Sequence, residues 1–418
     1  MRAVLQNLVS VIGGEAAVRV ANFVAVLFIA RAYGRASLGA YAVSLAVVTV
    51  VVMFADNGLQ TAAITQISSP GENRNRIIGR LNLSKTILLA LAAMILAVLA
   101  GWTRQDSFFL GIGAWVTIRA ILQSYSQLQM AVLKSVSLAN WIGLIQCLHS
   151  FVLFIGIWVS FKNDWTIFAL LAWLTTGQFL EFLLVVAVLF RNGIWPSWPG
   201  HLAFLATITM AAPFGIAYGL ANLIVRLDTI VLSTLVPLAE LGAFSAANTI
   251  LVIVYVCAWL FGSILLPEMV RLSSQPENLK DYAKRWARWV VLITVPCALL
   301  ASLAAPRAIV FLYGPLFATS GILVSVMILA CPLILLNSIY TTLTVAANSR
   351  VIFLGIYSAS VIATLALDFF IGRAFGSMGI ALAIVVREAG MLIAFWLFTS
   401  RLPLPATGLE LRTSSGGN

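Results

Sequence analysis

Long, continuously apolar segments dominate this chain and limit what it can fold into. A helix needs about 20 mostly apolar residues to cross the hydrocarbon core of a bilayer. Segments of about this length are predicted at residues 8–30, 37–58, 82–101, 108–132, 139–160, 165–190, 203–232, 239–267, 287–304, 319–345, 350–371 and 377–399. They lack the strict alternation of a transmembrane strand. The sequence therefore predicts an all-α polytopic membrane protein with about twelve transmembrane helices.

The composition supports a membrane protein and argues against a nucleic-acid partner. Hydrophobic residues make up 61% of the chain and charged residues 9%, whereas soluble domains average about 25% charged residues. The net charge is +11, but the basic residues lie between apolar spans and form no basic patch on a soluble domain. We therefore expect no nucleic-acid partner.

A repeated motif divides the chain into two similar halves. The segment ASLGAYAVSL at 36–45 recurs as AELGAFSAAN at 239–248, 203 positions later. Each copy opens one apolar span and follows another, so the repeat predicts two six-helix lobes related by a pseudo-twofold axis along the membrane normal. The expected parts are an N-terminal lobe at 1–192, a cytoplasmic linker at 193–202, a C-terminal lobe at 203–400 and a cytoplasmic tail at 401–418.

Lysine and arginine are concentrated in the connections on one side of the predicted bundle. The two longest of these connections, 67–81 and 268–286, occupy equivalent places in the two halves, and both are basic. Because cytoplasmic connections carry an excess of lysine and arginine, this distribution places both termini in the cytoplasm.

Several motifs resemble one known family across nearly the whole chain. The first half contains IARAYGRASLGAYAVSLAVV at 29–48 and DNGLQTAAITQIS at 56–68, with Arg31, Gly34, Gly39 and Tyr41 at the family's positions. The second half contains RLDTIVLSTLVPLAELGAFSAANTI at 226–250 and LYGPLFATSGILVSVMI at 312–328. These motifs resemble the polysaccharide transporters, which include the O-antigen and exopolysaccharide flippases (Wzx-like) of the multidrug/oligosaccharidyl-lipid/polysaccharide (MOP) superfamily. The resemblance specifies the superfamily better than the substrate.

The resemblance implies a MATE-like fold and a function. The function is to flip a lipid-linked (undecaprenyl-pyrophosphate) oligosaccharide repeat unit across the bacterial inner membrane, for O-antigen, capsule or exopolysaccharide synthesis. Two lobes would alternate access to a central cavity, coupled to a gradient of H⁺ or Na⁺. The expected partners are the lipid-linked substrate, membrane lipids, and the polymerase and glycosyltransferases of the pathway. We expect neither an enzyme nor a cofactor, because no catalytic triad, metal-ligand spacing or phosphate loop occurs in the sequence.

Charged residues inside the spans are the candidate site residues. Burying one costs about 2.5–3.5 kcal/mol on insertion scales, so each needs a reason. We expect arginines to hold the pyrophosphate by bidentate hydrogen bonds and a carboxylate to take the coupling ion. Four basic and four acidic residues cancel in charge, which argues against a wholly cationic tunnel. The candidates for substrate binding are Arg19, Arg119, Arg226 and Arg387, and those for ion coupling are Glu15, Glu181, Asp228 and Glu388.

Each candidate also has a purely structural interpretation. Glu15 and Arg19 are four residues apart on one helix face and can form a salt bridge. Arg119 faces either the cavity or Glu181. His149 in the predicted span 139–160 either changes protonation near neutral pH or is a hydrogen-bonded packing residue.

The second-half charges have similar alternatives. Arg226 and Asp228 point roughly 200° apart on a helix, so we expect different neighbours for them. Arg387 and Glu388 point about 100° apart. Pro213 is our candidate for a hinge, with a static kink as the alternative. At the repeat offset of 203, Arg19 corresponds to Asn222, so the charges do not follow the repeat.

Two other functions compete with the flippase. An ion-coupled exporter of small molecules or drugs, from the same superfamily, should have acidic and aromatic cavity residues without matching arginines. The four embedded arginines count against it. A membrane-embedded glycosyltransferase or polymerase would need a sizeable polar loop, and every loop here is short.

Overall fold

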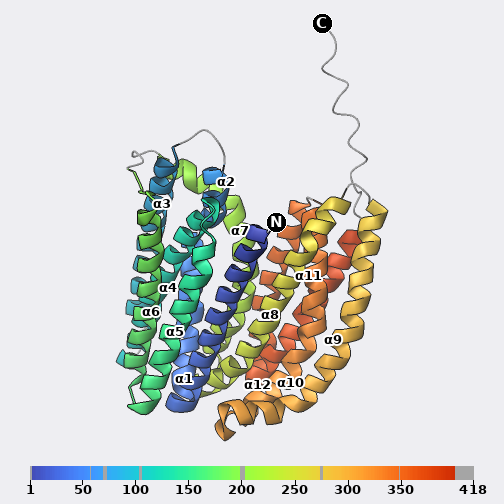
Figure 1. The fold of residues 1–418 in the computed structure, drawn as a ribbon. Helices are drawn as coiled ribbons and strands as arrows, with labels where there is room; N and C mark the ends of the chain where they lie inside the picture. The colour runs from blue at the N-terminus through green and yellow to red at the C-terminus, as the bar shows by residue number, and fades with distance from the viewer. Residues whose placement is uncertain are drawn as a thin grey trace. The chain divides into compact units, whose positions relative to one another are not determined.

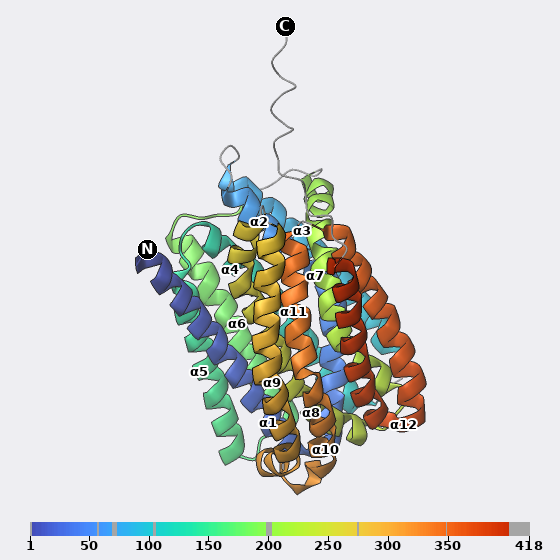
Figure 2. The same cartoon turned by 90° about the vertical axis from the view of Figure 1, so that its right-hand side faces the viewer.

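The computed structural model describes residues 2–56, 58–68, 73–102, 106–197, 203–273, 276–347 and 349–400. Over these residues the chain is helical and forms no strand, as Figures 1 and 2 show. The helices are α1 (Arg2–Asp56), α2 (Leu59–Ser68), α3 (Arg74–Trp102), α4 (Ser107–Ser135), α5 (Asn140–Lys162), α6 (Ile167–Arg191), α7 (Ala203–Ser233), α8 (Leu238–Leu272), α9 (Pro276–Tyr313), α10 (Ala318–Met327), α11 (Cys331–Ala346) and α12 (Arg350–Ser400), with short 3₁₀ segments at Pro315–Phe317 and Ile328–Ala330.

Helices α1 and α12 are each two spans joined at a glycine. They contain 55 and 51 residues, far more than one crossing requires. Gly34 has φ 79° and Gly376 has φ 58°, a left-handed conformation that glycine adopts without steric cost. The sequence placed span boundaries on either side of both residues, and the kinks confirm those boundaries.

The predicted fold class, an all-α protein with many membrane-spanning helices, is confirmed. Among the described residues, nine continuous segments are long and apolar enough to cross a membrane. Two of these segments contain the kinks at Gly34 and Gly376, so each supplies two spans. Helix α7, with 31 residues, covers the predicted span 203–232 but is not among these nine segments, so the twelfth span stays a prediction.

Two expected connections are partly helical. Helix α3 begins at Arg74 and α9 at Pro276, so much of the expected loops 67–81 and 268–286 extends the spans as helix. Residues 305–318 are apolar but interrupted by Pro306, Gly314 and Pro315, a pattern that predicts an interfacial elbow. Helix α9 nevertheless continues through Pro306 to Tyr313. The break is confined to Gly314 and the 3₁₀ turn that follows it. Apolarity marks the extent of the membrane core, whereas backbone hydrogen bonding carries the helix beyond it.

The chain forms two compact units, residues 1–246 and 247–418, which we describe separately. In the first unit α1 packs against α4, α5 and α7, and α6 packs against α4 and α5. In the second unit α9 packs against α10 and α11, and α11 packs against α12. The division into lobes at residues 193–202 stays a prediction. The predicted tail 401–418 lies outside the described residues.

The repeated motif forms a close helix crossing within the first unit. A β-carbon at Gly39 of α1 would overlap the backbone oxygen of Leu238 in α8. Equally, a β-carbon at Gly242 would overlap the backbone oxygen of Arg35. Leu238 and Gly242 lie 203 positions after Arg35 and Gly39, so the two contacts are equivalent by the repeat. Small residues let membrane helices approach this closely, and the glycines of the motif have this role.

Candidate functional site

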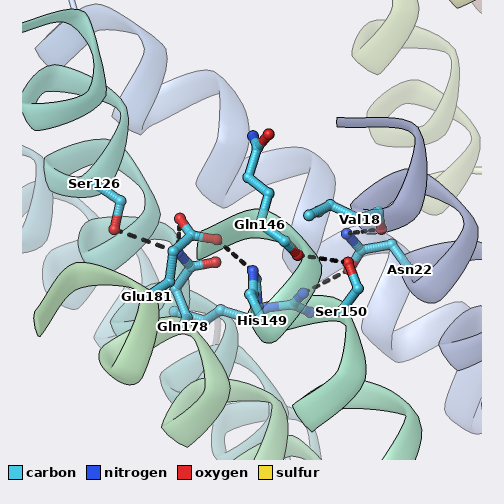
Figure 3. A network of polar contacts seen from close by, with 9 residues as sticks. Val18, Asn22, Ser126, Gln146, His149, Ser150, Gln178 and Glu181 are labelled. Atoms are coloured by element: carbon cyan, nitrogen blue, oxygen red, sulfur yellow. Dashed lines mark hydrogen bonds and ion pairs between the residues drawn. The ribbon is translucent and has the colours of Figure 1, made fainter. Parts of the chain in front are cut away.

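Polar side chains from three helices meet inside the first unit (Figure 3). On α6, a carboxylate oxygen of Glu181 contacts Nδ1 of His149 on α5. The other carboxylate oxygen accepts a hydrogen bond from Nε2 of Gln178 at 2.9 Å. The same Gln178 nitrogen reaches Oγ of Ser126 on α4 at 3.4 Å. His149, Gln178 and Glu181 are at most 5% exposed, so this cluster holds a titratable pair away from solvent.

The packing of α5 against α6 fixes the position of His149. Gly177 of α6 faces its imidazole ring, and a β-carbon there would lie 3.5 Å from Cδ2 of His149. Two turns along α5 from His149, Gly156 leaves space for the indole of Trp173 on α6. Nε1 of Trp173 donates a hydrogen bond to the backbone oxygen of Val152 at 2.8 Å. Nε2 of His149 is buried and has no hydrogen-bond partner among the described residues. A buried, unsatisfied polar atom is costly, so it marks a position of potential functional use.

Arg119 does not make the contact with Glu181 that its structural interpretation proposed. Its Nη2 donates to Oδ1 of Asn22 on α1 at 2.6 Å, and Asn22 donates from Nδ2 to the backbone oxygen of Val18 at 2.9 Å. The expected alternative pairing with Glu181 is wrong, because Glu181 contacts His149 and Gln178 instead. Arg119 remains half-buried.

The salt bridge between Glu15 and Arg19 is confirmed. Nη2 of Arg19 lies 2.7 Å from Oε1 of Glu15, and both side chains are more than two-fifths exposed. The pair neutralises its charges within one helix, which lowers the cost of placing them in a span. Asn22 follows Arg19 by three residues, so the same helical face continues to the Arg119 contact.

The second unit contains its own buried polar cluster, formed by α8, α11 and α12. Nη2 of Arg387 donates to the hydroxyl of Tyr255 at 3.0 Å, and that hydroxyl donates to Oε1 of Glu388 at 2.8 Å. Nδ2 of Asn337 donates to Oε2 of Glu388 at 2.8 Å. The Arg387 and Glu388 side chains are 2% and 5% exposed, with 3.5 Å between Nε and Oε1. Both carboxylate oxygens of Glu388 are therefore held.

The two charged residues on α7 differ in burial, and the expectation that they have different neighbours stays a prediction. Asp228 is 1% exposed and makes polar contacts. Arg226 is half-buried and interacts electrostatically with Tyr41 of α1. Pro213 lies within α7, but its side chain is outside the described part of the structure. The hinge role therefore stays a prediction.

Sequence reasoning missed one buried cation, Lys85. The distribution of lysine and arginine places Lys85 on the cytoplasmic side, near the start of the predicted span 82–101, yet it is fully buried and makes polar contacts. Helix α3 begins at Arg74, so Lys85 lies about three turns inside it. Its position only three residues into the apolar span was a signal that it could be embedded.

Among the described residues, no group of three or more His, Cys, Asp or Glu side chains could hold a metal ion. The clusters consist of charged and amide side chains between packed apolar helices, a type of site that binds ions or charged groups in membrane proteins. Fold and site together define the class: a polytopic helical membrane protein with buried charge clusters in both of its units.

The family follows from the sequence match. The model of a family described as polysaccharide biosynthesis protein matches residues 4–273, more than half of the chain. The chain therefore belongs to that family. No significant match was found among curated proteins.

Solved structures confirm the predicted fold class. The lipid II flippase MurJ in an inward closed conformation matches with a TM-score of 0.74 and 12% identity over 95% of this chain and 88% of that chain. An inward-facing multidrug resistance MATE transporter of the MOP superfamily matches with a TM-score of 0.70 and 12% identity over 91% and 93%. A Vibrio cholerae MATE transporter matches with a TM-score of 0.66 and 13% identity over 96% of both chains.

Proposed function

We propose that this protein is a flippase for a lipid-linked oligosaccharide. It would move a repeat unit carried on undecaprenyl pyrophosphate from the inner to the outer leaflet of the bacterial inner membrane, for O-antigen, capsule or exopolysaccharide synthesis. Membership of the polysaccharide biosynthesis family is the observation that carries this proposal. The fold shared with a lipid II flippase agrees with it. Both termini would lie in the cytoplasm, as the distribution of lysine and arginine predicts.

Arg119 is the first of the four arginines that we assign to the pyrophosphate. Arg387 is already held by Tyr255 and Glu388, and Arg19 by Glu15. In contrast, Arg119 forms no ion pair with any described residue, and its Nε has no hydrogen-bond partner among them. A guanidinium group carries five N–H donors arranged to bind phosphate oxygens in pairs. Arg119 therefore retains donors for an anionic group, while its contact with Asn22 fixes its direction.

Glu181 is the acid that we assign first to ion coupling. Its contact with His149 places two titratable groups side by side in a dry interior. One proton can be exchanged between an imidazole and a carboxylate without creating an isolated charge. Glu15, Asp228 and Glu388 remain further candidates for H⁺ or Na⁺, and a polymerase and glycosyltransferases remain proposed partners.

Replacing Arg119 with alanine should reduce polysaccharide export by about 10-fold or more. A hydrogen bond to a charged group contributes about 1.5–3 kcal/mol, and each 1.4 kcal/mol is a factor of ten. The measurement is exported polysaccharide in cells that lack the natural copy, at equal amounts of membrane-inserted protein. Arg191→Ala is the matched control, because Arg191 is exposed at the end of α6. Equal export by the two variants would remove Arg119 from the site.

The second candidate is an ion-coupled exporter of small molecules, and the likeness to MATE transporters favours it. Deletion of the gene separates the two functions. A flippase deletion should cause the lipid-linked intermediate to accumulate in the inner leaflet. An unchanged intermediate combined with altered drug resistance would support the exporter.

A further inference from the structure

The second unit has an apolar groove that neither the proposed arginines nor the proposed acids use. It has a volume of about 570 Å³ and lies between α9, α11 and α12. Helices α9 and α11 run side by side in Figure 2. Aliphatic side chains form most of the groove, including Val291, Leu292 and Ile393, and all three are more than two-fifths exposed. The volume falls within the range of about 300–1,000 Å³ that is typical of small-molecule sites.

The groove has a cation at one end. Arg288 is the charged lining residue, and it forms no hydrogen bond or ion pair with any residue that the structure describes. Lys280 and Lys284 precede it at intervals of four on the same face of α9. Of these, Lys284 lies 3.9 Å from Asp281. A row of basic residues therefore leads to Arg288, at the end of the unit that the sequence places in the cytoplasm.

The repeat provides a comparison groove in the first unit, between α3, α4 and α6. Leu189 and Phe190 line it, and the residues 203 positions later, Leu392 and Ile393, line the groove of the second unit. The two grooves thus occupy equivalent places in the duplicated scaffold. A feature shared by both would be a property of the scaffold, whereas a difference indicates specialisation of one copy.

The two grooves differ in size and in polarity. The groove of the first unit has a volume of about 170 Å³, and no lysine or arginine occurs among its described lining residues. Asn82 and Gln129 line it and are joined by a hydrogen bond of 2.6 Å. At the repeat offset Arg288 corresponds to Lys85, but Lys85 is fully buried and makes polar contacts. Of these two grooves, the second therefore combines the larger apolar volume with a guanidinium that has no partner among the described residues. This combination is complementary to a hydrocarbon chain that ends in a phosphate.

We propose that the groove between α9, α11 and α12 binds the first part of the polyprenyl chain of the lipid-linked substrate, with the chain's phosphate at Arg288. This inference rests on the proposed function and assigns the lipid part of the cargo. The exposed aliphatic side chains take the methyl-branched chain, and the guanidinium takes the phosphate oxygens. Trp396 lines the groove, and an indole suits the boundary between chain and headgroup.

The test is lipid binding to the purified full-length protein, followed by native mass spectrometry. The probes are undecaprenyl monophosphate and phosphatidylglycerol, added separately and in competition. Arg288→Glu replaces the positive charge with a negative one, and Ile393→Trp places a larger side chain in the groove. The matched controls are Arg285→Glu, an exposed charge reversal in the same turn of α9 outside the groove lining, and Leu303→Trp, an exposed α9 residue away from the groove.

We expect wild type to prefer undecaprenyl monophosphate, and both groove variants to bind it about tenfold more weakly than their controls. One basic residue near an anionic lipid accounts for about fivefold, and charge reversal for more. If Arg288→Glu does not fold, Ile393→Trp still decides the result. Equal binding by groove and control variants would overturn the groove assignment alone. Equal competition by phosphatidylglycerol would make the groove a phospholipid site and overturn the inference. A wild type that does not bind undecaprenyl monophosphate would count against the proposed function as well.

Discussion

Replacing Gly39 with valine should strongly destabilise the protein. The added side chain would enter the backbone of α8 at Leu238, within the first unit. Overpacking a well-packed interior costs about 1–3 kcal/mol, and a backbone obstacle cannot rotate away as a side chain can. We expect a loss of at least about 3 kcal/mol, measured as a lower midpoint of thermal unfolding in detergent or as loss of folded protein.

The matched control for this prediction is Gly390→Val on α12. Gly390 is also helical, but nothing lies within 4 Å of a β-carbon built on it. Both substitutions change helix propensity equally, so the difference between them measures the crossing alone. Gly242→Val should behave as Gly39→Val does, because its side chain would enter the backbone at Arg35. If Gly39→Val unfolds at the temperature of Gly390→Val, the motif does not form the crossing.

Replacing Arg387 with alanine should lower the free energy of unfolding by about 3–5 kcal/mol, the usual effect of removing one partner of a buried ion pair. The carboxylate of Glu388 would keep its hydrogen bonds from Tyr255 and Asn337 but lose the neighbouring positive charge. Denaturant titration of the purified variant gives the free energy. The control is Arg373→Ala on the same helix, where the side chain is exposed and the expected change is within about 0.5 kcal/mol.

The double variant Arg387→Ala/Glu388→Ala tests the reason for that loss. If the uncompensated carboxylate is the cause, removing it as well should recover part of the stability, with a coupling energy of about 0.5–3 kcal/mol. Strictly additive losses would mean that Arg387 stabilises the cluster through packing and its Tyr255 contact instead.

The helical spans could be predicted from the sequence because apolarity over about 20 residues is a local property. Even the kinks at Gly34 and Gly376 fell between predicted spans. The extensions of α3 and α9 beyond the membrane core were not predicted, because their polar residues lower the local hydropathy below that of a membrane span. A helix continues there because its backbone hydrogen bonds do not depend on apolar side chains.

The charged residues of the candidate site could be predicted from the sequence, but the residues that they contact could not. Glu15 and Arg19 are joined by helical spacing, which the sequence contains. Asn22, Tyr255 and Asn337 hold arginines and acids across helices, and only the packing of those helices brings them together. Neutral polar residues occur in most of the predicted spans, so these three give no specific signal in the sequence.

The repeat explains the scaffold but not the charge clusters. The glycine crossing of α1 and α8 follows the offset of 203, as do residues of the two grooves. The charges do not: Glu181 corresponds to Ile384, and Arg387 corresponds to Leu184. Duplication supplied the packing surfaces, and later substitution placed different chemistry in each copy. This difference supports a transporter whose two units perform separate tasks.

The most direct test of the central claim is a flipping measurement in vesicles that contain only the purified protein. A fluorescent undecaprenyl-pyrophosphate oligosaccharide is placed in both leaflets, and a membrane-impermeant quencher is added outside with an imposed ion gradient. We predict that active protein makes the inner-leaflet fraction accessible to the quencher, and that Arg119→Ala slows this about tenfold. An inner-leaflet fraction that stays protected, at the level of protein-free vesicles, would contradict the assignment as a flippase.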